Sequence, residues 1–322
     1  MEGTNTQKPE SEMRLFKIPT EEFEKHLNTE LSKEKVKEIL DILKNSNNLR
    51  TKEEFEEIKI RLYTSCRKGE FELTKIYLNE KIENEDLTFK IDKSNQTASL
   101  FKVNKIFEQL TIPRTVKHES IDYLITSITG TGNNIKTIQF VDNSAVKTIY
   151  SDAFSQSKIE EIHFPSSLIE LQSGWCFGTD ELTKIIISPS NGQFIFQEDK
   201  YLLGKTDPNS DEFDNFLYAI RNTKEISIPS NIKVISPFAF YQCYDLTKVE
   251  IPTNSNLEII GSDSFSQTYI EEIYIPPKVL KICEFAFYEC QNLKRIEIPQ
   301  NSNLQTIESN SFRNSTIEEI LD

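Results

Sequence analysis

The sequence predicts a mixed α and β protein, in which a repeat solenoid with a parallel β-sheet on one face follows a small helical N-terminal region. The first observation is a near duplication, since FAFYQCYDLTKVEIP at 238–252 returns as FAFYECQNLKRIEIP at 285–299. The second is a Phe that recurs in the C-terminal part, mostly every 22 to 25 residues. The third is helical spacing of apolar residues near the N-terminus. Together they predict stacked repeats with helices in front.

The N-terminal part is expected to hold a flexible end, residues 1–19, and a helical region, residues 20–86. Apolar residues in this region fall on helical stripes, as at Phe23, Leu27 and Leu31. The stretch CRKGEFELTKIYL, residues 66–78, resembles the helix pair of an ankyrin repeat, with Gly69 at the turn. A generic helical hairpin explains the same stretch equally well.

Alternation replaces the helical pattern at 87–133, in LTFKID and ASLFKVN, which predicts a β cap and a divergent first repeat. Residues 134–322 are expected to form the regular repeats. The unit reads hydrophobic-x-x-Ile-x-Ile-Pro, a polar stretch, Leu/Ile-x-x-Ile, then four residues and Phe. The Phe positions are Phe154, Phe177, Phe240, Phe265, Phe287 and Phe312. A period of about 20 to 29 residues with one short strand is typical of leucine-rich repeats.

Each unit can bury its apolar side only against its neighbours. In the strand at 248–252, Val249 and Ile251 should point inward while Lys248 and Glu250 point outward. The following Pro cannot donate to a strand ladder and ends the strand. A second aliphatic pair then runs back along the far side, and the Phe closes the coil. Stacking of such units predicts a solenoid.

The repeat pattern has two further features, an insertion and a column of mostly small residues. Between Phe177 and Phe240 the spacing is much longer, and residues at about 190–220 are expected to form an inserted hairpin with a polar turn. Three residues after each Phe stands Ser157, Asp180, Cys243, Thr268, Cys290 or Ser315. Because Ser, Cys and Thr exchange at this position, we interpret it as packing in a tight turn, not as a metal or nucleophile site.

Two columns of side chains should point outward from the strand face. The first is Thr137, Glu161, Lys184, Glu225, Lys248, Glu272, Arg295 and Glu319. Its charges alternate in sign from Glu161 onward, which predicts an ion-pair ladder between neighbouring strands. The second column follows no such rule and is our candidate protein-binding surface: His163, Ile186, Ser227, Glu250, Tyr274 and Glu297.

Several function classes are disfavoured by the sequence. The three His lie in different segments, and no phosphate loop, dinucleotide fingerprint or hydrolase motif occurs, so we expect no enzyme, no metal and no cofactor. A net charge of −14 would repel nucleic acids and anionic membranes. No secretory signal or membrane-spanning run is recognisable, which by sequence predicts a cytoplasmic protein without direct membrane insertion.

The pairs LTKVEIP … LEIIGSDSF and LKRIEIP … LQTIESNSF resemble the BspA-like class of leucine-rich repeats, over residues 110 to 322. That resemblance implies a non-enzymatic surface antigen or adhesin that binds host or matrix protein at the cell surface. The alternative is an intracellular scaffold or adaptor, whose repeat face and helical leader hold a cytosolic partner. The chain stops at TIEEILD without a polar capping unit, which predicts either self-association through this edge or a truncated gene product.

Overall fold

The computed structural model describes residues 79–132 and 135–321, and this part of the chain is a β-solenoid. It contains strands and turns but no helix, so the predicted mixed α and β class is wrong for the described residues. Residues 80–83, which we placed in the helical region, form strand β1 (Glu80–Glu83), with Ile82 buried between exposed Lys81 and Glu83. Residues 20–78 of the predicted helical region, including the ankyrin-like hairpin, lie outside the described residues.

The chain divides into two compact units, residues 1–82 with 90–96, and residues 83–89 with 97–322. Strands β1 and β2 (Leu87–Asp92) both cross the boundary between the units. The second unit contains all the remaining strands and the whole repeat region, and the following description concerns this unit.

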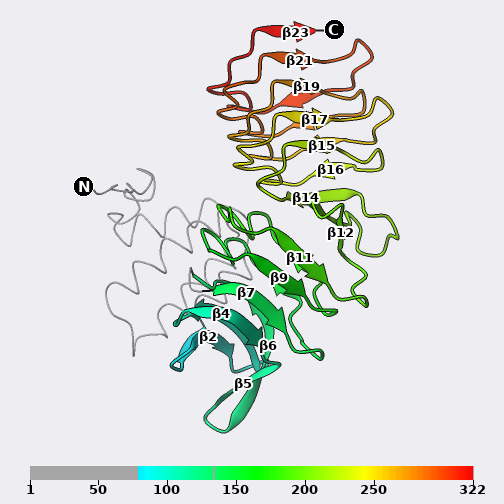
Figure 1. Cartoon of the computed structure of the whole chain (residues 1–322). Helices are drawn as coiled ribbons and strands as arrows, with labels where there is room; N and C mark the ends of the chain where they lie inside the picture. Colours follow the sequence, from blue (N-terminus) through cyan, green and yellow to red (C-terminus); the bar gives the residue numbers. More distant parts are fainter. Residues whose placement is uncertain (1–78, 133–134, 322) are drawn as a thin grey trace, which may run out of the picture. The chain divides into compact units, whose positions relative to one another are not determined.

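One side of the repeats carries the predicted parallel strands (Figure 1). The first run is β4 (Phe107–Ile112), β7 (Ile135–Phe140), β9 (Glu161–Phe164) and β11 (Lys184–Ile187). The second run is β15 (Glu225–Ser227), β17 (Lys248–Glu250), β19 (Glu272–Tyr274), β21 (Arg295–Glu297) and β23 (Glu319–Leu321). Every hydrogen-bonded pair among these strands is parallel and in register, as with Tyr274 opposite Glu297.

The opposite side of the solenoid carries further parallel sheets, which the sequence reading did not predict. Their strands are β3 (Thr97–Val103), β6 (Ile121–Ile128), β8 (Thr148–Ile149), β10 (Glu170–Leu171), β16 (Val234–Ile235), β18 (Ile259–Ile260), β20 (Lys281–Ile282) and β22 (Thr306–Ile307). Most have two residues because the returning aliphatic pair is all that a unit of 22 to 25 residues leaves between its turns. This short return is also the physical reason why the repeats hold no helix.

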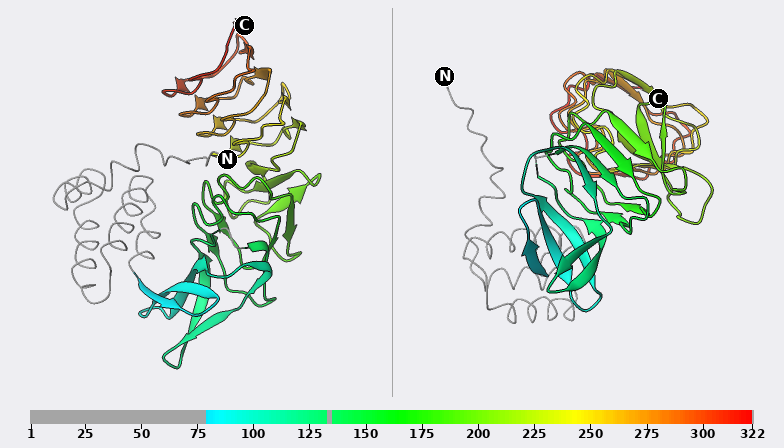
Figure 2. Two further views of the ribbon diagram at one scale, coloured as in Figure 1. Left: turned by 60° about the vertical axis from the view of Figure 1, so that its left-hand side comes forward. Right: turned by 60° about the horizontal axis from the view of Figure 1, so that its bottom comes forward.

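Two segments depart from the repeat. Strand β5 (Thr115–His118) pairs antiparallel with β6 in a hairpin that extends away from the repeats (Figures 1 and 2). Residues 195–219 form three antiparallel strands, β12 (Ile195–Gln197), β13 (Tyr201–Gly204) and β14 (Asn215–Ala219). Strand β14 then pairs in parallel with β16, so this insertion joins the return side. On the strand face, β11 ends one sheet and β15 begins another.

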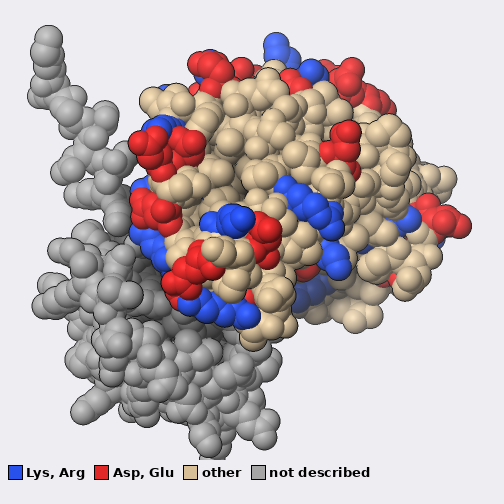
Figure 3. All heavy atoms as spheres, turned by 90° about the horizontal axis from the view of Figure 1, so that it is seen from below, with Lys and Arg blue, Asp and Glu red and all other residues tan. Residues whose placement is uncertain are grey.

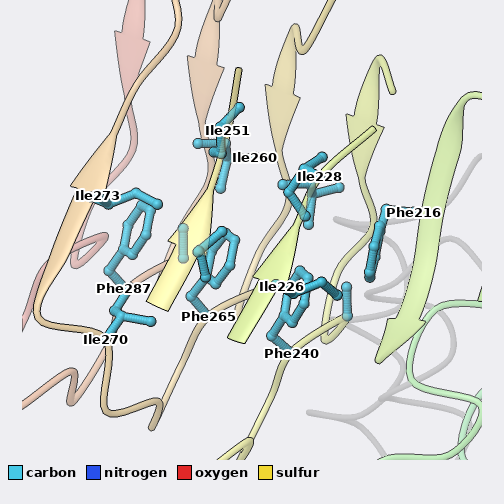
Figure 4. Packing of buried hydrophobic residues seen from close by; sticks show 14 of the residues in the cluster. Phe216, Ile226, Ile228, Phe240, Ile251, Ile260, Phe265, Ile270, Ile273 and Phe287 are labelled. Carbon is cyan, nitrogen blue, oxygen red and sulfur yellow. The ribbon is translucent and has the colours of Figure 1, made fainter. Parts of the chain in front are cut away.

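The core of the second run is a stack of phenylalanine rings (Figure 4). Their centroids are 4.7, 4.8, 5.2 and 5.0 Å apart along the series Phe216, Phe240, Phe265, Phe287 and Phe312. The first four rings are fully buried, and the last three pairs are parallel within 5°. Each repeat therefore contributes one ring to a continuous ladder.

Phe177 does not belong to this column, contrary to our alignment. The N–H of Phe154 bonds the carbonyl of Trp175, whereas the N–H of Phe240 bonds that of Ser264. Because Ser264 directly precedes Phe265, the residue equivalent to Phe265 is Cys176, which is buried. Phe177 is only half-buried and packs on Phe238 and Tyr241 instead.

The one-residue shift also corrects the small-residue column. Thr179 replaces Asp180 in it, and its hydroxyl donates to the Phe154 carbonyl at 2.7 Å. The thiol of Cys290 donates to the Phe265 carbonyl at 3.0 Å, and the hydroxyl of Ser315 to the Phe287 carbonyl at 2.6 Å. In these three cases a small donor satisfies the carbonyl of the preceding repeat, whereas Thr268 donates to the Phe265 carbonyl of its own repeat at 2.9 Å. Ser, Thr and Cys can exchange there because each is a small side chain with a donor.

Candidate functional site

The predicted binding column is split between the two runs of strands. His163 on β9 pairs with Ile186 on β11 in the first sheet. Ser227, Glu250, Tyr274 and Glu297 lie on β15, β17, β19 and β21 in the second run. These four residues line one groove of about 320 Å³, whereas His163 and Ile186 do not line it.

The alternation of short strands builds this groove. Val249 and Ile273 point into the core at the middle of their three-residue strands, so both neighbours in each strand must point outward. Pro252 lines the groove two residues beyond the end of β17. Five of the lining residues are charged: Lys248, Glu250, Glu272, Arg295 and Glu297.

Both cations that line the groove are already paired. Lys248 Nζ lies 2.5 Å from Glu250 Oε1 on its own strand. Arg295 bridges two strands, with Nη1 at 3.3 Å from Glu272 Oε2 and Nε at 3.3 Å from Glu319 Oε2. Among the described residues no ion pair joins Glu297. The groove therefore carries one carboxylate whose charge is not neutralised by a neighbour.

The predicted charge ladder is thus present in part. Lys184 pairs with Glu161 at 3.0 Å, and Arg295 pairs on both sides as expected. Lys248 departs from the pattern, because its ammonium pairs along β17 and not across to a neighbouring strand. A long side chain can reach either the next strand or the second residue on its own strand, and strand spacing alone does not decide between them.

Tyr274 stands in the middle of this column. It is half-buried, and its strand β19 lies between β17 and β21 (Figure 1). Burial, and to a lesser degree the nearby Glu297 carboxylate, raises the pKa of the Tyr274 phenol. The side chain therefore stays a neutral phenol at physiological pH and presents an aromatic ring between two carboxylates.

His163 belongs to a separate network on the first sheet. Its Nε2 lies 2.5 Å from Glu161 Oε1, and the other oxygen of Glu161 accepts from Lys184 Nζ at 3.0 Å. Burial opposes ionisation of Glu161, but these hydrogen bonds outweigh it and lower its pKa. Ile186 stands beside His163 and is 37% exposed. Neither His163 nor Ile186 lines the groove of the second run.

A buried arginine is the main polar feature that the sequence reading missed. Arg221 stacks over the ring of Tyr218 at 4.5 Å and donates to the Ala239 and Phe238 carbonyls at 3.1 and 3.4 Å. Its Nη1 also lies 3.6 Å from Cys243 Sγ. The sequence signal was a lone Arg after the apolar run FLYAI. Its contacts are those of a structural anchor for the turn at 238–239.

The buried thiols are poor candidates for chemistry. Burial raises the pKa of Cys176 to about 12 and that of Cys290 to about 11, and it also raises the pKa of Cys243. A protonated thiol is a weak nucleophile and a weak metal ligand. Within residues 79–132 and 135–321, no group of three or more His, Cys, Asp and Glu could hold a metal ion.

Charge on the surface is mixed. On the face shown in Figure 3, acidic and basic side chains lie in small adjoining groups. The described residues on that face therefore offer no continuous basic area for nucleic-acid phosphates. No helix in the described part of the chain is long and apolar enough to cross a membrane.

At the edge of the second run, β23 is the last strand of its sheet. Ile320 and Leu321 on this strand are 64% and 41% exposed. Self-association through this edge stays a prediction.

Comparison with known proteins gave a family match. The family described as BspA type Leucine rich repeat region matches residues 97–198 and 211–321, with six copies. The comparison with curated proteins gave no match.

Solved structures of bacterial proteins are also similar. One is a leucine rich cell surface protein from Faecalibacterium prausnitzii, with 16% identity, coverage of 76% of this chain and 94% of that chain, and a TM-score of 0.41. Another is the pneumococcal vaccine antigen PcpA, with 17% identity, coverage of 70% and 77%, and a TM-score of 0.40. A leucine-rich repeat protein from Bacteroides ovatus has 16% identity, coverage of 72% and 69%, and a TM-score of 0.36.

Proposed function

The chain belongs to the BspA type leucine rich repeat family, and on that premise we propose that it is a non-catalytic protein-interaction module whose contact surface is the groove of β15, β17, β19 and β21. One observation carries the proposal. The groove gathers Ser227, Glu250, Tyr274 and Glu297, the four candidate residues of the second run, around one half-buried aromatic ring.

The form of the groove favours a protein partner over a small molecule. Five of its eleven lining residues carry exposed charged side chains, whereas small-molecule pockets are mostly apolar and enclosed with only a few polar groups. A tyrosine with a rigid ring surrounded by polar side chains is the arrangement that concentrates binding energy at protein interfaces. The strands on which these side chains stand are held by a packed core, so the surface is preorganised.

More specifically, we propose that the protein is a surface antigen or adhesin that binds a host or matrix protein. This step rests on the resemblance of the repeats to a class in which several members are regarded as surface antigens. Antibody staining of intact and permeabilised cells tests it. Staining of intact cells is expected, and staining only after permeabilisation would overturn the adhesin role.

The contact surface itself is tested by an attachment assay. Purified protein is applied to cultured host cells and to a panel of immobilised matrix proteins, alongside the variants Tyr274→Ala and Tyr244→Ala. Tyr244 is a matched control, since its ring is 45% exposed but lies outside the groove. It stands in the turns that connect β16 to β17, and we call this part of the repeats the turn side. We expect Tyr274→Ala to weaken attachment at least several-fold and Tyr244→Ala to leave it unchanged. Equal attachment of both variants would exclude the groove.

A further inference from the structure

Resting on the proposed function, we infer that the groove binds a basic side chain of the partner protein. In this arrangement the guanidinium or ammonium group of an Arg or Lys lies over the Tyr274 ring and pairs with Glu297. The side chain is carried by an extended segment of the partner. The bound group is therefore a cation, and its source is a protein.

The charges of the groove select a cation. Three carboxylates line it, those of Glu250, Glu272 and Glu297, against the two cations Lys248 and Arg295. Both cations are paired within the described residues, as is each carboxylate other than Glu297. An incoming anion would meet the unneutralised Glu297, whereas an incoming cation completes its pairing. An exposed ion pair alone contributes only about 0 to 1 kcal/mol, so binding needs a second contact beside Glu297.

The Tyr274 ring supplies that second contact. A cation over an aromatic face is attracted by the negative face of the ring, and Arg and Lys are the side chains that use this interaction. Register puts Tyr274 directly opposite Glu297 on the adjacent parallel strand. Parallel neighbours are about 4.8 Å apart, so one guanidinium can lie over the ring and reach the carboxylate at the same time.

The dimensions of the groove indicate an extended segment. Its lining runs from Ser227 on β15 to Glu297 on β21, which is three steps from strand to strand; at the spacing of paired strands this is at least about 14 Å, since β17 and β19 are not hydrogen-bonded to each other. An extended chain covers about 3.3 to 3.6 Å per residue, so roughly four residues span the groove. The net charge of −14 would in addition accelerate the encounter with a basic partner.

The test uses a probe of defined chemistry. Full-length protein labelled with ¹⁵N is titrated with the peptide acetyl-Thr-Val-Arg-Val-Thr-amide and with the same peptide carrying citrulline in place of Arg. Citrulline has nearly the shape of Arg without its charge. We expect the Arg peptide to shift the backbone amide signals of Tyr274 and Glu297, and the citrulline peptide to bind more weakly. Equal binding of both peptides, or shifts that lie outside the groove, would overturn the inference.

Variants of the groove test which side chains contribute to binding of the Arg peptide. Glu297→Gln and Tyr274→Leu should each weaken the Arg peptide about two- to fivefold, whereas Tyr274→Phe keeps the ring and should not weaken it. Glu225→Gln is the matched charge control, because Glu225 lies on β15 outside the groove lining and its carboxylate is also exposed. Equal effects of the two glutamine variants would mean that only overall charge attracts the peptide, and would overturn the inference.

The two proposals can fail separately. If Tyr274→Ala abolishes attachment while Glu297→Gln and Glu225→Gln attach equally, the groove is the contact surface but its ligand is not a cation. If the Arg peptide binds in the groove with the expected dependence on Glu297, while attachment ignores Tyr274, the site for basic side chains stands and the attachment surface lies elsewhere.

Discussion

Removal of one ring from the middle of the phenylalanine ladder should cost a large part of the stability of the second run. Phe265 is fully buried and lies between Phe240 at 4.8 Å and Phe287 at 5.2 Å, with interplanar angles of 5° and 2°. In Phe265→Ala a cavity replaces the ring, and the rigid neighbouring repeats limit how far it can close.

The magnitude follows from the lost burial and the two lost ring contacts. Truncation removes roughly 100 to 150 Å² of buried apolar surface, or about 3 kcal/mol at 25 cal/mol per Å². Each of the two ring pairs adds about 0.5 to 1.5 kcal/mol, so a total of about 4 to 6 kcal/mol is expected. Phe312→Ala is the matched control, because this half-buried ring has one stacking neighbour, Phe287 at 5.0 Å. It should cost about half as much.

Urea-induced unfolding measures both variants. Far-ultraviolet circular dichroism follows the whole chain, while fluorescence of the single tryptophan, Trp175, follows the repeats before the insertion. In a solenoid each repeat is held mainly by its neighbours, so in Phe265→Ala the dichroism transition should precede the fluorescence transition. A cost for Phe265→Ala no greater than for Phe312→Ala would refute the continuous ladder.

Two carboxyl groups give further predictions. Asp214 is buried and accepts from Thr206 and Lys233, and these bonds outweigh burial and lower its pKa. The stability that the Asp214 carboxylate contributes is therefore present above pH 3.8 and lost as the pH falls below that value. Asp214→Asn should lower the unfolding free energy at pH 7 by about 1 to 3 kcal/mol, with exposed Asp211→Asn as the control. Burial, and secondarily the charge of Glu284, raises the pKa of Asp263 to about 6, so its contribution is full below pH 3.8 and lost as the pH rises through 6. Asp263→Asn should therefore raise the melting temperature at pH 7 and not at pH 4. The substitution should not strain the backbone, because the positive φ of 54° suits Asn as well as Asp. An equal shift of the melting temperature at both pH values would contradict the raised pKa of Asp263.

Local pattern was sufficient to predict the strands of the repeat and their faces. Alternation around Val249 correctly assigned the buried and exposed residues of β17, because a strand has a period of two residues. It could not choose between Cys176 and Phe177, since the segment WCF offers three consecutive apolar residues and the neighbouring repeat decides which one enters the core. The predicted helical region was wrong where the structure describes it, since residues 80–83 form strand β1.

The candidate site was predictable as a column but not as a surface. Ser227, Glu250, Tyr274 and Glu297 share one groove because their four strands follow one another in consecutive repeats, although β17 and β19 belong to two different sheets. His163 and Ile186 occupy equivalent places in the sequence pattern, yet the three-stranded insertion at 195–219 ends their sheet before β15 begins. How an insertion joins a sheet depends on pairing between distant segments, which a repeat alignment does not contain. The pairing of Lys248 within its own strand likewise required side-chain geometry.

The central claim is that the groove of β15 to β21 touches the partner protein, and site-specific photo-crosslinking tests it most directly. Benzoylphenylalanine is introduced at exposed Ser227 in the groove or, as control, at exposed Tyr244 on the turn side, and each protein is irradiated with the host or matrix protein to which the wild type attaches. The account predicts a crosslinked product from position 227 and none from position 244. A product from position 244 alone would show that the turn side carries the contact and would contradict the account.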